Sequence, residues 1–93
     1  MLMMNIAHKG LRRFYERDDA RALPAYLVNR IERILDDLAC ATGPHDMDRP
    51  AYRLHPLKGD RRGQWSVRVS GNWRIVFRFV DGAAVDIDLV DYH

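Results

Sequence analysis

The spacing of apolar side chains predicts a helix close to the start of the chain. Between residues 9 and 16, three apolar or aromatic side chains recur at helical spacing, namely Leu11, Phe14 and Tyr15. Side chains three and four residues apart lie on one face of a helix, so this segment is predicted to form a short amphipathic helix. The residues before it, 2–7, are predicted to form a short first strand.

A longer amphipathic helix is predicted next. Apolar residues recur at i, i+4, i+7, i+8 and i+11, namely Leu27, Ile31, Ile34, Leu35 and Leu38. Pro24 stands in the expected first turn and Gly43-Pro44 ends the pattern, as is typical of helix starts and stops. We expect the stripe to face the core, and Cys40 to be a small buried residue near the helix end.

The period of the pattern changes to two in the second half of the chain. Apolar residues alternate with polar ones in 64–70, 73–79 and 85–89; they are Trp65, Val67 and Val69, then Trp73, Ile75, Phe77 and Phe79, then Val85, Ile87 and Leu89. This alternation predicts a three-stranded antiparallel meander with one apolar face. Both tryptophans share the parity of the core positions, so we expect them in the core.

The same alternation predicts odd-numbered loops. A two-residue turn at Asp81-Gly82 would place Phe77 and Asp86 on one face, so the loop is predicted to be Val80-Asp81-Gly82. The first hairpin is predicted to turn at Ser70-Gly71-Asn72, which places Arg68 opposite Arg74. Such a like-charge pair costs stability unless an anion lies nearby.

These elements predict an α+β domain over residues 1–93, in which an N-terminal strand and two helices pack on one face of the meander. No apolar run is long enough to span a bilayer, and the start lacks the features of a signal peptide. With a single cysteine the chain has no internal disulfide and no cysteine-based zinc cluster, which fits the reducing cytoplasm. Nucleotide-binding, zinc-protease and serine-nucleophile motifs are also missing, and we expect no cofactor and no metal.

Charge is unevenly distributed along the chain. Residues 53–78 hold seven basic residues against one acidic residue, whereas the preceding residues balance and the last fifteen carry four aspartates without Lys or Arg. A basic block of this kind is a candidate surface for a polyanion. Arg68 and Arg78 are expected to pair with strand aspartates, namely Asp86 and Asp88. The loop residues 58–62 have only one acid near in sequence, so we expect their cations to be free.

Two clusters of titratable side chains stand out. The first contains His55 and Lys58, and the second is Asp91-Tyr92-His93 at the end of the last strand. RNA cleavage needs a base for the 2′-hydroxyl, an acid for the 5′-oxygen and cations for the phosphate, and imidazole suits both proton transfers. By themselves these residues favour RNA cleavage no more than simple phosphate binding.

The chain resembles the HigB branch of the RelE/ParE toxin superfamily over nearly its whole length. The resemblance is carried by HKGLRRFYE near the start, RLHPLKGDRRGQWSVRVSGNWRIVFRF in the middle and VDIDLVDYH at the end. The HxLKG, SGNWR and DYH motifs are specific in combination. Residues 1–5 depart from the family pattern.

The resemblance implies a ribosome-dependent endonuclease that cleaves messenger RNA at the ribosomal A site. It implies as partner a HigA-like helix-turn-helix antitoxin, through which alone the toxin would reach operator DNA. The family's active-site positions correspond here to His55, Lys58, Arg74, Asp91, Tyr92 and His93. We expect further RNA contacts from the basic segment, at Arg53, Arg61, Arg62 and Arg68. Asn72 is interpreted as a turn residue, and His8 and His45 as surface residues.

Two alternatives remain open. A ParE-like inhibitor of DNA gyrase would need no catalysis, and the two histidines around a cationic site argue against it. A non-catalytic basic module that binds RNA would keep the arginines and tolerate loss of the histidines. Fold alone does not separate these functions.

Overall fold

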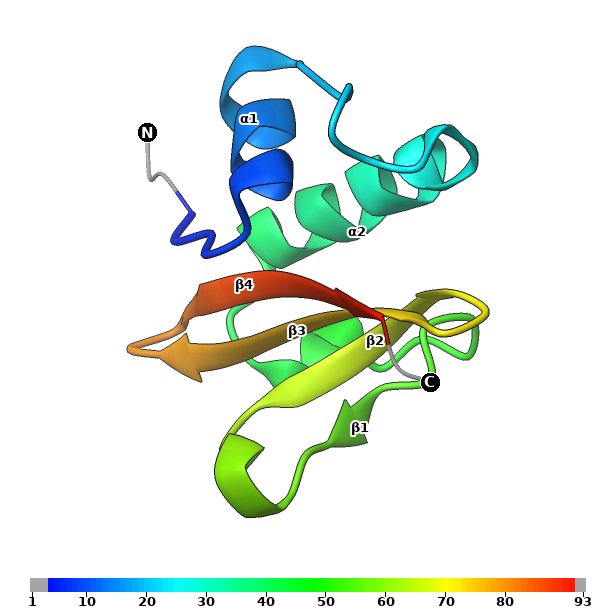
Figure 1. Cartoon of the computed structure of the whole chain (residues 1–93). Helices are drawn as coiled ribbons and strands as arrows, with labels where there is room; N and C mark the ends of the chain where they lie inside the picture. Colours follow the sequence, from blue (N-terminus) through cyan, green and yellow to red (C-terminus); the bar gives the residue numbers. More distant parts are fainter. Residues whose placement is uncertain (1–3, 92–93) are drawn as a thin grey trace.

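The computed structural model describes residues 4–91 (Figure 1). The order of elements, with η for 3₁₀ helices, is α1 (Lys9–Arg17), η1 (Ala25–Leu27), α2 (Val28–Cys40), η2 (Pro44–Met47), β1 (His55–Pro56), η3 (Gly59–Arg61), β2 (Trp65–Ser70), β3 (Trp73–Val80) and β4 (Ala83–Asp91). The strands form one antiparallel sheet in the order β1-β2-β3-β4. Helices α1 and α2 lie on the same side of this sheet (Figure 1). The predicted α+β class is confirmed. No described helix has the length and apolar character needed to cross a membrane.

The core lies between the helices and one face of the sheet. Its buried side chains include Leu11, Phe14 and all five predicted for the second helix, together with Ile6, Met47, Tyr52, Val67, Val69, Ile75, Phe77, Ala84, Ile87 and Leu89. Tyr15, predicted on the same face as Leu11, is only partly buried and packs against this cluster. Trp65 and Trp73 are partly buried and pack against this cluster, as predicted. Cys40 is exposed, so its predicted burial is wrong. The apolar stripe of α2 continues from Leu38 to the buried Ala41, and this spacing turns residue 40 towards solvent.

A histidine caps the start of helix α1. The Nδ1 atom of His8 accepts a hydrogen bond from the backbone N–H of Leu11 at 3.1 Å. The first N–H groups of a helix lack partners within it, and a capping side chain supplies one. His8, which was expected to be a surface residue, therefore caps the helix.

The turn between β3 and β4 is shorter than predicted. Val80 pairs with Ala83, so the loop holds only Asp81 and Gly82. Both loop residues have positive φ, 51° and 78°. Two-residue turns with two positive φ angles match the twist of the flanking strands. The predicted three-residue loop is therefore wrong.

A β-bulge in β4 takes up the odd residue that the prediction had placed in a longer loop, so the apolar side chains of both strands still face the core. The register of β3 and β4 shifts between residues 76 and 78 of β3, so Asp86 and Ile87 together lie opposite Phe77. Asp86 has φ 52°, a conformation that Asp tolerates better than most residues. Beyond the bulge Ile87 faces the core. Val85 lies outside the core cluster, against prediction.

The N-terminal segment runs beside β4 at this bulge. Ile6 forms an isolated parallel bridge with Ile87, and Asn5 Oδ1 accepts a hydrogen bond from the Asp86 backbone N–H at 2.8 Å. A bulge leaves one residue outside the ladder, and Asn5 supplies a partner for it. The predicted strand over residues 2–7 is not formed by residues 4–7, while residues 2 and 3 lie outside the described part.

The β2–β3 hairpin likewise combines a two-residue turn with a β-bulge. Ser70 and Trp73 form its last pair, so only residues 71 and 72 lie in the turn instead of the predicted three. Val69 is the additional residue of a bulge in β2. Because the bulge takes up the odd residue, the predicted pair of opposed arginines is confirmed.

Candidate active site

The face of the sheet opposite the helices carries a row of four residues, three of them polar, of which the two central ones, Ser66 and Val76, are buried. His55 pairs with Ser66, Ser66 with Val76, and Val76 with Asp88, which places one residue from each strand in line. Directly paired residues point to the same face of a sheet. Val67, the neighbour of Ser66 along β2, belongs to the core, so this row points away from the helices. We call this surface the outer face.

Two arginines form the next row of the outer face. Arg68 on β2 pairs with Arg74 on β3, and Arg74 pairs with Val90 on β4. The guanidinium of Arg74 donates to the backbone carbonyls of Gly71 and Trp73, at 3.0 and 3.2 Å. Both arginines are half-buried. Two like charges in this arrangement create a local positive potential that favours an anion.

Only one of the predicted strand ion pairs is formed. Arg78 pairs with Asp86 on the neighbouring strand, as predicted. Arg68 was expected to do the same, but β3 separates it from β4. Among residues 4–91, no carboxylate forms an ion pair with Arg68 or Arg74. Their charges are therefore available to a ligand on the outer face.

Lys58 lies in the loop that follows β1. This loop returns to β2 through a hydrogen bond from the Leu57 N–H to the Gln64 carbonyl at 2.9 Å. Gly59 and Gly63 have φ of 66° and 92°, which other residues rarely adopt, and they allow the tight course of the loop. The basic side chains Lys58, Arg61 and Arg62 are exposed. None forms an ion pair within the described residues, as expected for this loop.

Strand β1 is an element that the sequence analysis missed. It has two residues, His55 and Pro56, which are too few to produce an alternating pattern. The preceding chain is also tied to β2, because the Arg68 N–H donates to the Tyr52 carbonyl at 2.7 Å. Between these points, Arg53 has φ 48°, a strained conformation for arginine. His55 therefore stands on a short edge strand that follows a strained residue.

A cluster of side chains between α2 and the segment that precedes β1 was also missed. Arg30 on α2 donates to the carbonyls of Ala51 and Arg68, and its guanidinium carbon lies 5.3 Å from the centre of the Tyr52 ring. The Tyr52 hydroxyl donates to Asp37, and burial together with this hydrogen bond raises the pKa of Tyr52 to about 12. No sequence motif marks these residues, because the cluster joins positions far apart in the chain.

The structure thus brings together some of the predicted site residues. His55, Arg68 and Arg74 share the outer face, and Lys58 follows β1 in the adjoining loop. Asp91 ends β4 opposite Trp73, one position beyond the pair of Arg74 and Val90. The predicted residues Tyr92 and His93 lie outside the described residues. Arg53 is exposed and lies two residues before β1.

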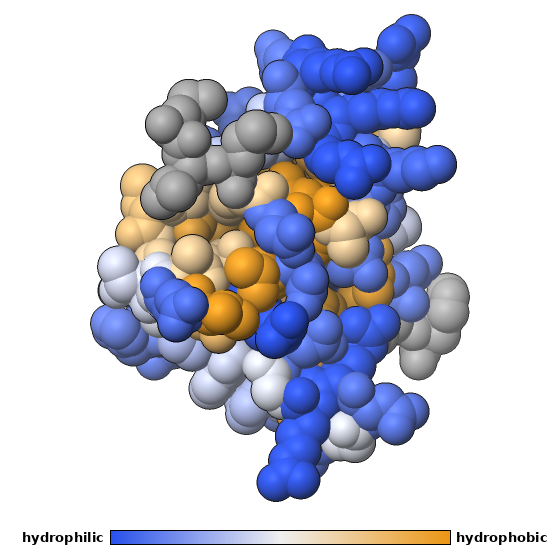
Figure 2. Space-filling model, turned by 90° about the vertical axis from the view of Figure 1, so that its left-hand side faces the viewer, coloured by the Kyte–Doolittle hydropathy of each residue, from blue (hydrophilic) through white to orange (hydrophobic). Residues whose placement is uncertain are grey.

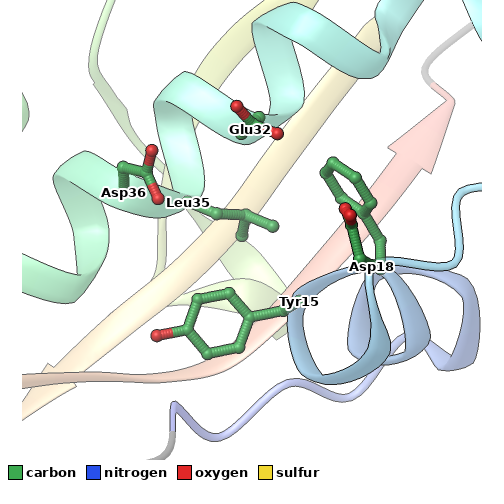
Figure 3. Close-up of a pocket in the computed structure, with 6 residues that line it drawn as sticks. Tyr15, Asp18, Glu32, Leu35 and Asp36 are labelled. Atoms are coloured by element: carbon green, nitrogen blue, oxygen red, sulfur yellow. The ribbon is translucent and has the colours of Figure 1, made fainter.

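Other surfaces offer different chemistry. A groove of about 370 Å³ lies between α1 and α2, and its walls are acidic or apolar; they are formed by Phe14, Tyr15, Asp18, Glu32, Leu35 and Asp36 (Figure 3). Three carboxylates make it unsuited to a phosphate. Figure 2 shows apolar surface on the side where the β3–β4 turn lies, and Val80 beside that turn is 42% exposed. In residues 4–91, no three His, Cys, Asp or Glu side chains are grouped to hold a metal ion.

Comparison with known proteins gives one family. Residues 4–93 match the model of the HigB-like toxins, described as RelE-like toxins of type II toxin–antitoxin systems. The chain is 41% identical over 92 residues to Endoribonuclease HigB of Proteus vulgaris, covering 99% of this chain and all of that protein. It is 32% identical over 87 residues to Toxin HigB-1 of Vibrio cholerae, covering 91% and 92% of the two chains.

Solved structures agree with the fold. A YoeB/ParE toxin from Agrobacterium tumefaciens superposes with a TM-score of 0.60 at 18% identity, over 99% of each chain. A YoeB dimer from Staphylococcus aureus gives 0.56 at 18% identity, again over 99% of each chain. At this level of identity the likeness concerns the arrangement of helices and strands.

Proposed function

This chain belongs to the HigB-like family of RelE-like toxins from type II toxin–antitoxin systems and is an endoribonuclease; we propose that it cleaves messenger RNA on the ribosome. The observation that supports this proposal best is the outer face, where His55 and the opposed pair Arg68 and Arg74 lie on neighbouring strands. An imidazole beside cations that form no ion pair within residues 4–91 suits cleavage at a phosphate.

The proposed reaction is an acid–base cleavage. A base takes the proton of the 2′-hydroxyl, the oxygen bonds to phosphorus, the bond from phosphorus to the 5′-oxygen breaks, and an acid protonates that oxygen. We assign the two proton transfers and the orienting role to His55, Asp91 and His93 together. We assign Lys58 and Arg74 to the negative charge that grows on the phosphate. Tyr92 would stack on a base or orient it.

RNA binding is assigned to the other cations of the basic segment, Arg53, Arg61, Arg62 and Arg68. Three of them are exposed and Arg68 is half-buried. Contacts of this type hold the phosphate backbone without reading its sequence. The ribosomal A site would then select the position that is cut, and we propose that residues 1–93 act there as one domain.

A toxin of a type II system has an antitoxin partner. We propose that the antitoxin is HigA-like with a helix-turn-helix, and that the toxin reaches operator DNA only through it. A protein that acts on translating ribosomes works in the cytoplasm, and we place it there, without a membrane partner.

The test is primer extension on a reporter mRNA in a translating extract, with and without the protein, next to the same RNA without ribosomes. We expect cuts within translated codons and intact naked RNA. Efficient, site-specific cutting of naked RNA would contradict ribosome dependence. Growth arrest with intact mRNA and inhibited gyrase would favour the ParE-like alternative. RNA binding without any cut would favour the non-catalytic module.

A further inference from the structure

We propose that Arg30 is a positioning residue for the candidate active site, which fixes the strand that carries His55 relative to the strand that carries Arg68. This inference rests on the proposed RNA cleavage. Arg30 lies on α2, on the side of the sheet away from the outer face, and has no expected contact with RNA.

The contacts of Arg30 join three elements. Its Nη2 atom donates to the carbonyl of Ala51, at 2.6 Å, and to the carbonyl of Arg68, at 3.3 Å. Ala51 precedes β1 and Arg68 lies within β2, so one nitrogen on α2 links the segment that leads into β1 to the neighbouring strand. The position is costly for the side chain, because its Nε atom is buried without a hydrogen-bond partner among the described residues.

The aromatic ring of Tyr52 also holds the Arg30 guanidinium in place. The Arg30 guanidinium lies 5.3 Å and the Arg49 guanidinium 5.9 Å from the centre of the Tyr52 ring. Tyr52 is only 2% exposed, and its hydroxyl donates to Asp37, which also pairs with Arg49 at 3.5 Å. Cation–π contacts of this kind favour a guanidinium over other side chains. Arg30 is thus held in place from both sides.

Strand β1 needs such support. It has two residues in register with β2, and one of them, Pro56, has no N–H to donate. A strand this short contributes little stability of its own. Arg53, two residues after Ala51 and two before His55, has a strained φ of 48°. Such strain persists only where the surrounding structure holds it. Without Arg30, we expect His55 to move relative to Arg68 and Arg74.

The experiment replaces Arg30 and compares a matched position on the same helix. Arg30→Met removes the donors and keeps an unbranched stem, Arg30→Lys keeps the charge without the planar fork, and Arg33→Met changes an exposed arginine of α2. The measurements are kcat and KM for cleavage of mRNA in ribosome complexes, thermal melting, and amide exchange by NMR.

We expect Arg30→Met to lower kcat about tenfold to a hundredfold while KM stays within about twofold, since displaced reacting groups cost rate more than binding. Arg30→Lys should have an intermediate kcat, and Arg33→Met should match the wild type. A folded Arg30→Met protein with wild-type kcat would overturn the proposal. If Arg30→Met does not fold, Arg30→Lys decides in the same way: a lower kcat supports the proposal and a wild-type kcat overturns it.

Amide exchange separates this inference from the proposed function. The Arg68 N–H, bonded to the Tyr52 carbonyl, should exchange about tenfold faster in folded Arg30→Met or Arg30→Lys, while the Ile87 N–H, bonded to Asn5, should not change. This result needs no cleavage by any variant, so it stands even if the wild type proves inactive. Equal acceleration at both amides would show general destabilisation and would overturn a positioning role.

Discussion

Arg68 and Arg74 lie directly opposite each other on adjacent strands, with no carboxylate of the described residues paired to either. Like charges at directly opposed positions of an antiparallel pair destabilise it by a few tenths of a kcal/mol to about 1 kcal/mol. The folded protein carries this cost on the same face as His55. A bound phosphate would offset it, which links the stability of the sheet to occupancy of the site.

The first prediction concerns anions. At matched ionic strength, replacing chloride with sulfate should raise the melting temperature of the wild type about 2–4 °C more than that of Arg68→Gln, because sulfate relieves a repulsion that the variant lacks. Sulfate stabilises most proteins to some extent, so the difference between the two proteins is the quantity to compare. Arg78→Gln, in which an ion-paired arginine is removed, should respond like the wild type. An equal response of all three proteins would show that the opposed arginines bind no anion.

The second prediction concerns proton transfer. His55→Ala should lower ribosome-dependent cleavage about 10²–10⁴-fold, as is typical for loss of a general acid or base. His45→Ala is the matched control, because that imidazole is exposed and lies beside Asp46 on η2, away from the outer face. Ribosome association should be unchanged in both proteins when it is measured by sedimentation. Wild-type cleavage by His55→Ala would move the proton transfers to the end of the chain.

The third prediction separates catalysis from binding among the loop cations. Lys58→Ala should lower kcat about 10²-fold with little change in KM, if its charge acts mainly on the transition state. Arg61→Ala and Arg62→Ala should instead raise KM and reduce the slope of log K against log salt by about one unit each. Cleavage kinetics and binding, both measured between 50 and 200 mM salt, separate the two effects. Identical effects of all three variants on binding and rate would indicate a simple polyanion surface.

The fourth prediction is a pH effect on stability. Burial and the hydrogen bond to Asp37 raise the pKa of Tyr52 to about 12, above the usual value of 10.0. A group whose pKa is raised by folding stabilises the protein fully below its unfolded pKa and loses that effect as pH rises through the folded pKa. Urea unfolding of Tyr52→Phe should therefore show a deficit of about 1 kcal/mol at pH 8 that shrinks between pH 10 and 12. A deficit that stays constant up to pH 12 would argue against this titration.

Periodicity was sufficient for the helices and the long strands. The stripe of Leu27, Ile31 and Leu38 and the alternation around Ile75 both depend on local geometry, which the sequence reflects directly. The turns were predicted less well, because alternation constrains only the parity between two strands. An odd residue can lie in the loop or in a bulge, and here Val69 and the segment at Asp86 take it up.

Some residues of the candidate site could be predicted from the sequence and others could not. Motif likeness named His55, Lys58 and Arg74, and the sheet register explains why two of them come together. The contribution of Arg30 and Tyr52 was not predictable, since it depends on a half-buried side chain of α2 reaching the backbone carbonyls of Ala51 and Arg68, which lie far from it in the sequence. Interactions with backbone carbonyls place no demand on the identity of the residues that supply them, so they leave no pattern in the sequence.

The outer face of the sheet has a consequence for the kind of polymer that the protein accepts. Both α-helices lie on the opposite side, and His55 stands on the edge strand, so a nucleic acid can lie across this surface and continue in both directions. Its termini need not pass through a tunnel. If the proposed cleavage takes place on this face, we expect circular RNA that is translated from an internal start to be opened as readily as a linear message, with a single linear molecule of full length as the first product.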